Sequence, residues 1–299
     1  MSDGTDIATY RDSLDVFSLL SDETRLNILL TLGNATTAQE PSTFSFNDFW
    51  HAVDIDDSGR FNYHLDKLRG SLITKGEAGY QLTYPGILVY KLVESGSFSS
   101  HDPRRPTETD IECFECDTTL TVAYEDQLVL IECPSCAETL TRIHVPPGCL
   151  RHESGAHLYR AAMQYMIREV ASLNHGICPN CGDQASHETM SATDRREDTD
   201  TPTVYSSCSG CGYWMRTGFG MPVALKPTVI SFYHDHSIDL LSGRTNHLLE
   251  LQVSRNGPVS VTPDGEHMAA FNKQLDDEQL SFEIDEALNL VDVERTTVQ

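Results

Sequence analysis

Eight of the nine cysteines in this chain occur as four Cys-x-x-Cys pairs. Four thiolates that converge in two pairs form a tetrahedral site of soft ligands, which suits Zn²⁺. The eight thiolates therefore predict two zinc ions for each chain. The pairs are Cys113/Cys116, Cys133/Cys136, Cys178/Cys181 and Cys208/Cys211.

The simplest arrangement joins the first pair with the second and the third with the fourth. The span 117–132 predicts a β-hairpin, because alternating residues 119–124 and 128–131 flank a Glu-Asp turn. A hairpin between two cysteine turns is typical of a zinc ribbon. The second module has a longer insert, in which residues 203–205 predict a short strand. A cross-braced pairing would use the same ligands, and the sequence does not choose between the two.

The residue after each second cysteine must turn the chain sharply. Gly182 and Gly212 take positive φ without steric cost, and Asp117 tolerates it better than most residues. Ala137 is the exception to this pattern. Such a turn points backbone N–H groups at the sulfur atoms, which stabilises the thiolates.

Other chemistry for the cysteines fits less well. Disulfides require an oxidising compartment, and the first ten residues contain no apolar signal segment, so we expect a cytoplasmic protein. Redox Cys-x-x-Cys motifs usually occur singly, whereas an iron site of the rubredoxin type could use the same ligands. A closed four-cysteine site leaves no open position for water, so the predicted zinc is structural. Because common catalytic motifs are also absent from the sequence, we do not expect an enzyme.

The chain is strongly acidic. Its 299 residues carry 45 acidic and 21 basic side chains, for a formal charge of −24. An acidic, lysine-poor surface suits a cytoplasm with molar salt, where screening reduces self-repulsion. No apolar run is long enough to cross a membrane, so no membrane partner is expected. The basic residues are unevenly distributed, since Arg60, Lys67, Arg69 and Lys75 lie within sixteen residues.

The first 96 residues predict a DNA-binding domain. Apolar periodicity indicates two helices in 11–32, joined tightly at 21–24, and a third beginning at residue 47 or 48. A fourth helix is expected over about 58–71, followed by a hairpin over 72–83 and a helix over 84–94. This order is that of a winged helix-turn-helix domain.

Two segments are family-specific. Residues 17–29, FSLLSDETRLNIL, and 57–68, DSGRFNYHLDKL, resemble ArsR-like winged-helix transcription regulators of the haloarchaeal type. Those relatives also carry cysteine-pair zinc modules, and residues 229–239 resemble the segment that follows the second module. The resemblance implies a homodimer bound to double-stranded DNA, with DNA contacts at Arg60, Asn62, Tyr63, His64, Lys67, Arg69 and, in the wing, Lys75.

The chain departs from metal-sensing members of that group in one respect. Their sensor ligands commonly form a Cys-x-Cys motif in the DNA-binding domain, and this chain has no cysteine before Cys113. A metal-released repressor would therefore lack its usual trigger here. The dimer of the group implies that helices over 11–20 and 86–94 of the two copies meet.

The remaining sequence predicts an α+β arrangement. Residues 97–110 are interpreted as a linker, 111–149 as the first zinc-ribbon module, 150–176 as a connecting helix, and 177–299 as the second zinc module with a C-terminal α+β region. Strands are expected at 249–253, 280–284 and 288–293. Cys149 is interpreted as an inert thiol. His234 and His236 would share a metal only on a strand, because on a helix they point apart.

These observations favour a sequence-specific, dimeric DNA-binding transcription regulator with zinc in its C-terminal half. That half would also be the place for an effector or a protein partner. The alternative is a zinc-ribbon adaptor that uses the winged helix for protein or RNA contacts. The charge of the 58–75 region distinguishes the two hypotheses.

Overall fold

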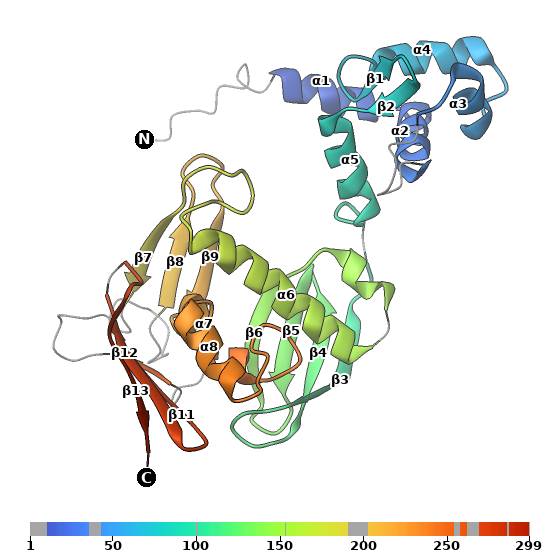
Figure 1. Ribbon diagram of the computed structural model, residues 1–299. Coiled ribbons are helices and arrows are strands. Elements are labelled where there is room, and N and C mark those ends of the chain that lie inside the picture. Colours follow the sequence, from blue (N-terminus) through green and yellow to red (C-terminus); the bar gives the residue numbers. More distant parts are fainter. Residues whose placement is uncertain are drawn as a thin grey trace, which may run out of the picture. The chain divides into compact units, whose positions relative to one another are not determined.

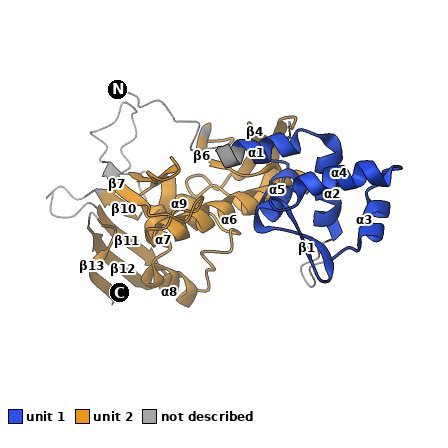
Figure 2. Ribbon diagram, turned by 90° about the horizontal axis from the view of Figure 1, so that it is seen from above, with its two compact units in different colours: residues 1–100 blue, residues 101–299 orange. Residues whose placement is uncertain are grey.

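The computed structural model describes residues 11–35, 43–99, 101–152, 154–190, 203–253, 258–261, 269–285 and 287–298. The chain forms two compact units, Met1–Ser100 and His101–Gln299 (Figure 2). Each unit has its own hydrophobic core. Together they contain helices and several antiparallel sheets, so the predicted α+β class is confirmed.

The first unit follows the predicted element order. Side chains cap four of its helices, since Asp22, Ser45, Asp57 and Thr83 each accept a hydrogen bond from a backbone N–H of the first helical turn. The elements are α1 (Arg11–Leu20), α2 (Glu23–Ala35), α3 (Phe46–Ala52), α4 (Ser58–Leu68), β1 (Ile73–Gly76), β2 (Gly79–Leu82) and α5 (Tyr84–Glu94).

A compact aromatic cluster holds α3 and α4 together. The rings of Phe49 and Phe61 meet edge to face with centroids 5.4 Å apart, and both side chains are fully buried. Leu65 and Leu68 of α4 and Leu32 of α2 complete this part of the core. One face of α4 is therefore buried in the core of the first unit.

The second unit begins with a four-stranded antiparallel meander, in the order β3-β4-β5-β6 (Figure 1). The strands are β3 (Arg104–Glu112), β4 (Thr119–Glu125), β5 (Leu128–Cys133) and β6 (Glu138–His144). The predicted hairpin is confirmed as β4 and β5. The predicted linker over 97–110 is wrong from Arg104 onward, because this part pairs with β4 as a sheet edge.

Helix α6 (Gly155–Leu173) packs on this sheet after the short 3₁₀ helix η2 (Pro147–Arg151) (Figure 1). A Cβ atom at Gly155 would lie 2.1 Å from the carbonyl oxygen of Glu108, so the close start of α6 against β3 requires glycine. The predicted connecting helix is thus confirmed. A second, three-stranded sheet follows, formed by β7 (Ser186–Met190), β8 (Thr203–Ser207) and β9 (Trp214–Gly218).

The C-terminal region combines helices with a third sheet, in the order β10-β11-β12-β13. The expected strands near 280–284 and 288–293 are confirmed as β12 and β13, whereas the expected strand at 249–253 is wrong because α9 covers it. The elements are α7 (Gly220–Ala224), α8 (Pro227–Asp235), α9 (His247–Val253), β10 (Val259–Val261), β11 (Ala269–Leu275), β12 (Glu278–Ile284) and β13 (Leu290–Thr297).

One main core unites most of the second unit. It contains Tyr124 of the first sheet, Tyr159 of α6, Phe232 of α8 and Phe282 of the third sheet. Leu173, Cys178, Ala185 and Cys208 form a smaller, separate core beside the second sheet. In the described ranges, no helix has the length and apolar character needed to cross a membrane.

Candidate metal centres and nucleic-acid interface

The first four cysteines converge at the end of the β4–β5 hairpin. Their sulfur atoms all lie within 4.8 Å of one another. Sγ of Cys116 is 3.5 Å from both Cys133 and Cys136, and the Cys113–Cys136 separation is 4.0 Å. Tetrahedral zinc with Zn–S bonds of about 2.3 Å places its sulfurs about 3.8 Å apart. These distances fit that geometry and are far too long for disulfide bonds.

The last four cysteines form an equivalent cluster. Sγ of Cys178 lies 3.7 Å from Cys211, and Sγ of Cys181 lies 3.7 Å from Cys208. The pairing is therefore sequential, and the cross-braced alternative is excluded. Both clusters are compatible with zinc-binding sites, two in the chain.

Three of the four cysteine turns share one backbone pattern. The backbone N–H of the first cysteine donates to the carbonyl oxygen of the residue five positions later. The backbone N–H of the residue after the second cysteine donates to the carbonyl oxygen of the first cysteine. In the turn that starts at Cys208, the backbone N–H of Cys208 donates to the carbonyl oxygen of Tyr213 at 2.9 Å. The backbone N–H of Gly212 donates to the carbonyl oxygen of Cys208 at 3.0 Å. Asp117, Gly182 and Gly212 have positive φ, as predicted. Ala137 is not an exception, because its φ is 54°.

Nearby donors stabilise negative charge on the sulfurs. The backbone N–H of Cys136 donates to Sγ of Cys133 at 3.3 Å, and the Asn180 amide donates to Sγ of Cys211 at 3.4 Å. The bond to Asn180 lowers the pKa of Cys211 to about 6. The adjacent Cys116 sulfur raises the pKa of the Cys136 thiol. Four thiols this close do not all ionise on their own, so the cluster calls for a compensating cation.

Both clusters are closed, and half of their cysteines are buried. The first cysteine of each pair is at most 2% exposed, whereas the second lies nearer the surface. All four tetrahedral positions are supplied by sulfur, which leaves none for a substrate or water. This arrangement suits a metal that stabilises the fold.

Helix α4 exposes the predicted DNA-contact residues that it carries, with a single exception. Arg60, Asn62, Tyr63 and Lys67 are all exposed, whereas His64 is only 9% exposed. His64 turns inward, and its Nδ1 lies 3.4 Å from Oδ1 of Asp22. His64 is thus shielded from solvent, unlike the other residues of α4 for which the resemblance implies DNA contacts.

Asp66 organises the centre of the exposed face. It accepts hydrogen bonds from Asn62 at 3.2 Å and from Arg69 at 2.8 Å. The ammonium group of Lys67 lies 5.6 Å from the centre of the Tyr63 ring. Lys75 is exposed on β1, the strand that follows this helix in the sequence.

The other sequence candidates have structural roles. His236 ends α8, where Nδ1 lies 2.8 Å from the carbonyl oxygen of Phe232 and Nε2 lies 3.6 Å from Glu278. Asp235 pairs with Arg295 at 2.7 Å. Burial raises the pKa of the Cys149 thiol to about 11, as expected for an inert cysteine.

Comparison with protein families divides the chain as the structure does. Residues 110–290 match a family described as a domain of unknown function, DUF7351. The chain belongs to the DUF7351 family. Residues 13–93, within the first unit, match a second domain of unknown function, DUF7347. No curated protein and no solved structure matches the chain.

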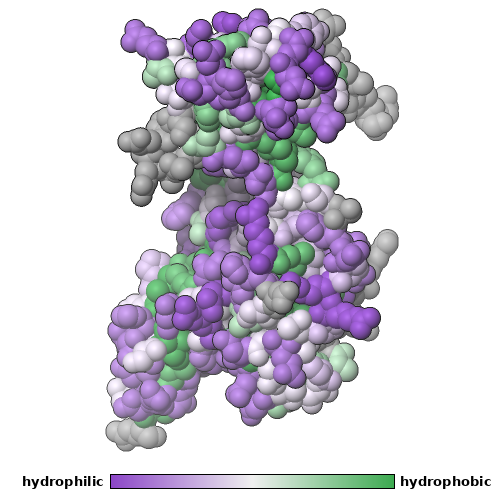
Figure 3. Space-filling model, turned by 90° about the vertical axis from the view of Figure 1, so that its right-hand side faces the viewer, coloured by the Kyte–Doolittle hydropathy of each residue, from purple (hydrophilic) through white to green (hydrophobic). Residues whose placement is uncertain are grey.

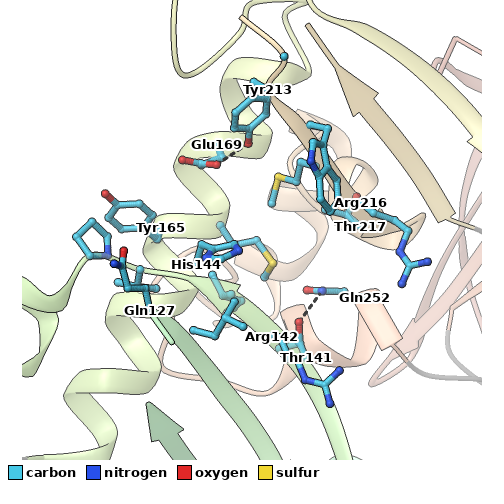
Figure 4. A pocket seen from close by; sticks show the side chains of 18 residues that line it. Gln127, Thr141, Arg142, His144, Tyr165, Glu169, Tyr213, Arg216, Thr217 and Gln252 are labelled. Carbon is cyan, nitrogen blue, oxygen red and sulfur yellow. Dashed lines mark hydrogen bonds between the residues drawn. The ribbon is translucent and has the colours of Figure 1, made fainter. Parts of the chain in front are cut away.

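The DUF7351 region also contains a cleft that the sequence does not reveal. It has a volume of about 740 Å³ and lies between β6, α6 and β9 (Figure 4). Tyr213 donates a hydrogen bond to Glu169 across one part of it, at 2.5 Å. Burial and the Glu169 carboxylate raise the pKa of Tyr213. Its lining residues are spread over the sequence from Gln127 to Gln252, so no local motif predicts the site.

Proposed function

We propose that the chain is a sequence-specific, dimeric DNA-binding transcription regulator whose second unit is stabilised by two zinc ions. The observation that carries this proposal is the division of α4 into two faces. Phe61, Leu65 and Leu68 are buried, while Arg60 and Lys67 are exposed on the opposite face. A packed helix with an exposed basic and amide-bearing face suits insertion into a DNA groove.

The element order supports the same function. Four helices, a hairpin and a final helix are the sequence of elements in a winged helix-turn-helix, where a helix in the position of α4 reads the major groove. Arginine and asparagine are the side chain types that make bidentate contacts with guanine and adenine edges, so Arg60 and Asn62 are the candidates for base contacts. Lys67 and Lys75 suit phosphate contacts, which position the domain without reading sequence.

Exposed apolar residues support a dimer. Leu14 and Phe17 on α1 are 51% and 67% exposed, and Leu88 and Leu92 on α5 are 44% and 47% exposed. Each pair is spaced three or four residues apart, so it forms a stripe along its helix. A second copy that packs α1 and α5 against their equivalents would cover both stripes.

DNA binding is tested with the segment upstream of the chain's own gene, labelled for fluorescence anisotropy and measured in high salt. Arg60→Ala/Lys67→Ala should weaken binding by at least about tenfold, since a bidentate base contact contributes about 1–3 kcal/mol. Arg105→Ala/Arg244→Ala removes two exposed arginines from the second unit and serves as the charge-matched control. It should bind like the wild type.

Two results would contradict the proposal. If the α4 variant and the control bind the DNA equally well, α4 is not the reading element. If the wild type shows no preference over a scrambled sequence, it is not sequence-specific. Binding of a protein or an RNA through α4 without DNA binding would favour the adaptor alternative.

A further inference from the structure

The cleft between β6, α6 and β9 is bounded by the edges of two sheets. Strands β6 and β9 are each the last strand of their sheet, so one side of each has no neighbour among the described strands. Six consecutive residues in and after β6, 141–146, line the cleft, as do six in and before β9, 212–217. Successive side chains of a strand point to opposite faces of its sheet. An unbroken run of lining residues therefore means that each strand presents its edge to the cleft.

The outer edge of β6 carries unpaired backbone groups. The N–H of Val145 donates to the carbonyl oxygen of Gln127 at 3.1 Å, which fixes the alternation of hydrogen bonds between β5 and β6. In such a ladder, every second residue directs its N–H and C=O groups away from the neighbouring strand. Arg142 and His144 occupy these positions. Over the ranges that the structure describes, their backbone groups have no hydrogen-bond partner. Such an edge is a template for another strand.

The side chains beneath the cleft are apolar. Tyr165 and Met166 come from α6, and Ile143 and Met215 come from the two sheet edges. Ile143 and Met166 are buried, and the other two are partly buried and pack against the main core. A strand in the cleft would direct every second side chain onto these residues, because its side chains alternate between two faces.

Trp214 forms an apolar rim on the β9 side. Its side chain is 62% exposed, although tryptophan is highly buried on average. Its ring stacks on Tyr205 of β8 with an interplanar angle of 20°, so the indole is held in place. A fixed, exposed tryptophan beside a cleft is typical of a residue that contacts a partner.

Helix α9 closes the gap between the two edges at one end. Nε2 of Gln252 donates to Oγ1 of Thr141 at 3.0 Å (Figure 4). The carbonyl oxygen of Gln252 lies against Gly218, where a Cβ atom would come within 1.8 Å of it. Gln252 is only 9% exposed, and no described residue hydrogen-bonds to its Oε1. Exchanging the two amide atoms leaves the nitrogen unpaired instead, so a polar atom is available to an occupant in either orientation.

We propose that this cleft binds an extended peptide segment of a partner protein, which adds as a strand to the outer edge of β6. Its backbone pairs with Arg142 and His144, and every second side chain is apolar and packs on Met166 and Met215 beside Trp214. A row of alternating N–H and C=O groups matches another peptide backbone, which favours a peptide over a small aromatic ligand. The proposal concerns the second unit alone and does not depend on DNA binding.

The test begins with a phage-displayed library of random octapeptides, selected on the full-length, zinc-loaded protein. We expect the enriched peptides to share apolar residues at every second position. A labelled copy of the most enriched peptide then gives the affinity by fluorescence anisotropy. In the Trp50→Phe protein Trp214 is the single tryptophan, so its emission should change when the peptide enters the cleft. If no peptide is enriched, or if the emission of Trp214 stays constant, the proposal fails.

A proline at position 144 tests the pairing with β6. Proline lacks a backbone N–H, and the N–H of His144 faces the cleft, so the ladder with β5 is kept. His144→Pro should weaken peptide binding at least about tenfold, since a hydrogen bond is lost and the proline ring takes its place. The matched variant His144→Ala keeps the N–H and should bind like the wild type. Equal affinity of the two variants would overturn the proposal.

Peptide analogues decide the question if His144→Pro does not fold. N-methylation of every second backbone nitrogen removes the donors along one edge of the peptide and leaves its side chains unchanged. At least one of the two alternate sets should abolish binding. If neither set affects binding, side chains alone hold the ligand. If no peptide binds and His144→Pro reduces the mass of the protein in solution, the occupant is a second copy of the chain. Either result would overturn the proposal.

Discussion

Asp22 connects two helices of the first unit through a single carboxylate. It accepts the backbone N–H of Arg25 at 3.1 Å, which caps α2, and it faces the inward-turned His64 of α4. Burial raises the pKa of Asp22, but the Arg25 backbone bond and the charges of His64 and Arg25 outweigh it, so the pKa is lowered overall. The carboxylate is therefore ionised at neutral pH.

Replacing Asp22 should loosen the first unit. Asp22→Ala should lower its free energy of unfolding by about 1 kcal/mol, the usual cost of a lost cap, whereas Asp22→Asn should cost less because asparagine also caps helices. Because the folded pKa of Asp22 is lowered, its stabilisation is complete above the unfolded value of 3.8 and fades as the pH falls further.

Urea unfolding in a Trp214→Phe background measures this effect, since Trp50 then reports on the first unit alone. The difference between wild type and Asp22→Ala should be present at about pH 5 and should shrink as the pH falls below about 3.8. A difference that is absent at about pH 5, or that grows as the pH falls below about 3.8, would show that Asp22 does not have this role.

At the scale of elements, the cysteine turns are small units with the same geometry and different sequences. Gly212 has a φ of 71°, and a Cβ atom there would meet nothing within 4 Å. Ala137 holds the corresponding position of another turn at a φ of 54°. Left-handed backbone costs an ordinary residue roughly 1–2 kcal/mol, so Ala137 bears a strain that Gly212 avoids.

Exchanging these residues should change stability in opposite directions. Gly212→Ala should destabilise the second unit by about 1 kcal/mol, because it adds strain without a clash. Ala137→Gly should stabilise it by about 0.5 kcal/mol, since relief of strain exceeds the added freedom of the unfolded chain. Thermal unfolding of the metal-loaded variants measures both, and a shift in the same direction would refute the strain argument.

The elements that the sequence predicts best are those with a clear repeat. The helices of the first unit and the β4–β5 hairpin follow from apolar periodicity. The sequence pattern does not predict strand β3, because this strand is a sheet edge with mostly exposed side chains. Only Ile111 is buried in it. Helix α9 is misread as a strand because Leu249, Leu251 and Val253 alternate with polar residues, as the residues of a half-buried strand do.

The candidate sites show the same division. Cysteine spacing predicts both clusters, since a four-sulfur site needs local pairs. Burial of His64 also has a signal in the sequence, because it lies three residues after Phe61 and four before Leu68, on the same side of the helix. The cleft has no such signal in the sequence, because tertiary packing alone brings β6, α6 and β9 together.

At the scale of the molecule, the two metal sites should differ in importance. Cys113 and Cys133 belong to the main core, whereas Cys178 and Cys208 belong to the smaller one. Elemental analysis should give about two zinc ions per chain. Cys113→Ser and Cys178→Ser should each lose one ion, and Cys113→Ser should lower the melting temperature more.

Cys149→Ser provides the matched control, since this buried cysteine is outside both clusters and should retain both ions. Equal destabilisation by Cys113→Ser and Cys178→Ser would show that the two cores unfold together. Iron in place of zinc, or no bound metal at all, would reject the assignment of the metal.

The excess negative charge should make stability depend on salt. Hydrophilic residues cover much of the face shown in Figure 3. Raising KCl should increase the melting temperature steeply and then level off near 1 M, where the screening length is only about 3 Å and repulsion is largely removed. Calorimetry over this range checks the prediction, and a melting temperature that falls or stays constant as KCl rises would contradict it.

The sequential pairing of the cysteines has a consequence for synthesis of the chain. Each cluster takes its four ligands from one short stretch, 113–136 or 178–211, so each can close soon after it leaves the ribosome. Phe271, Phe282 and Ile284 of the main core arrive much later. A nascent chain can thus hold both metals while its main core is still incomplete. Synthesis of the segment that contains β11, β12 and Leu288 completes this core, and release before that point would yield a metal-loaded protein that is prone to aggregate.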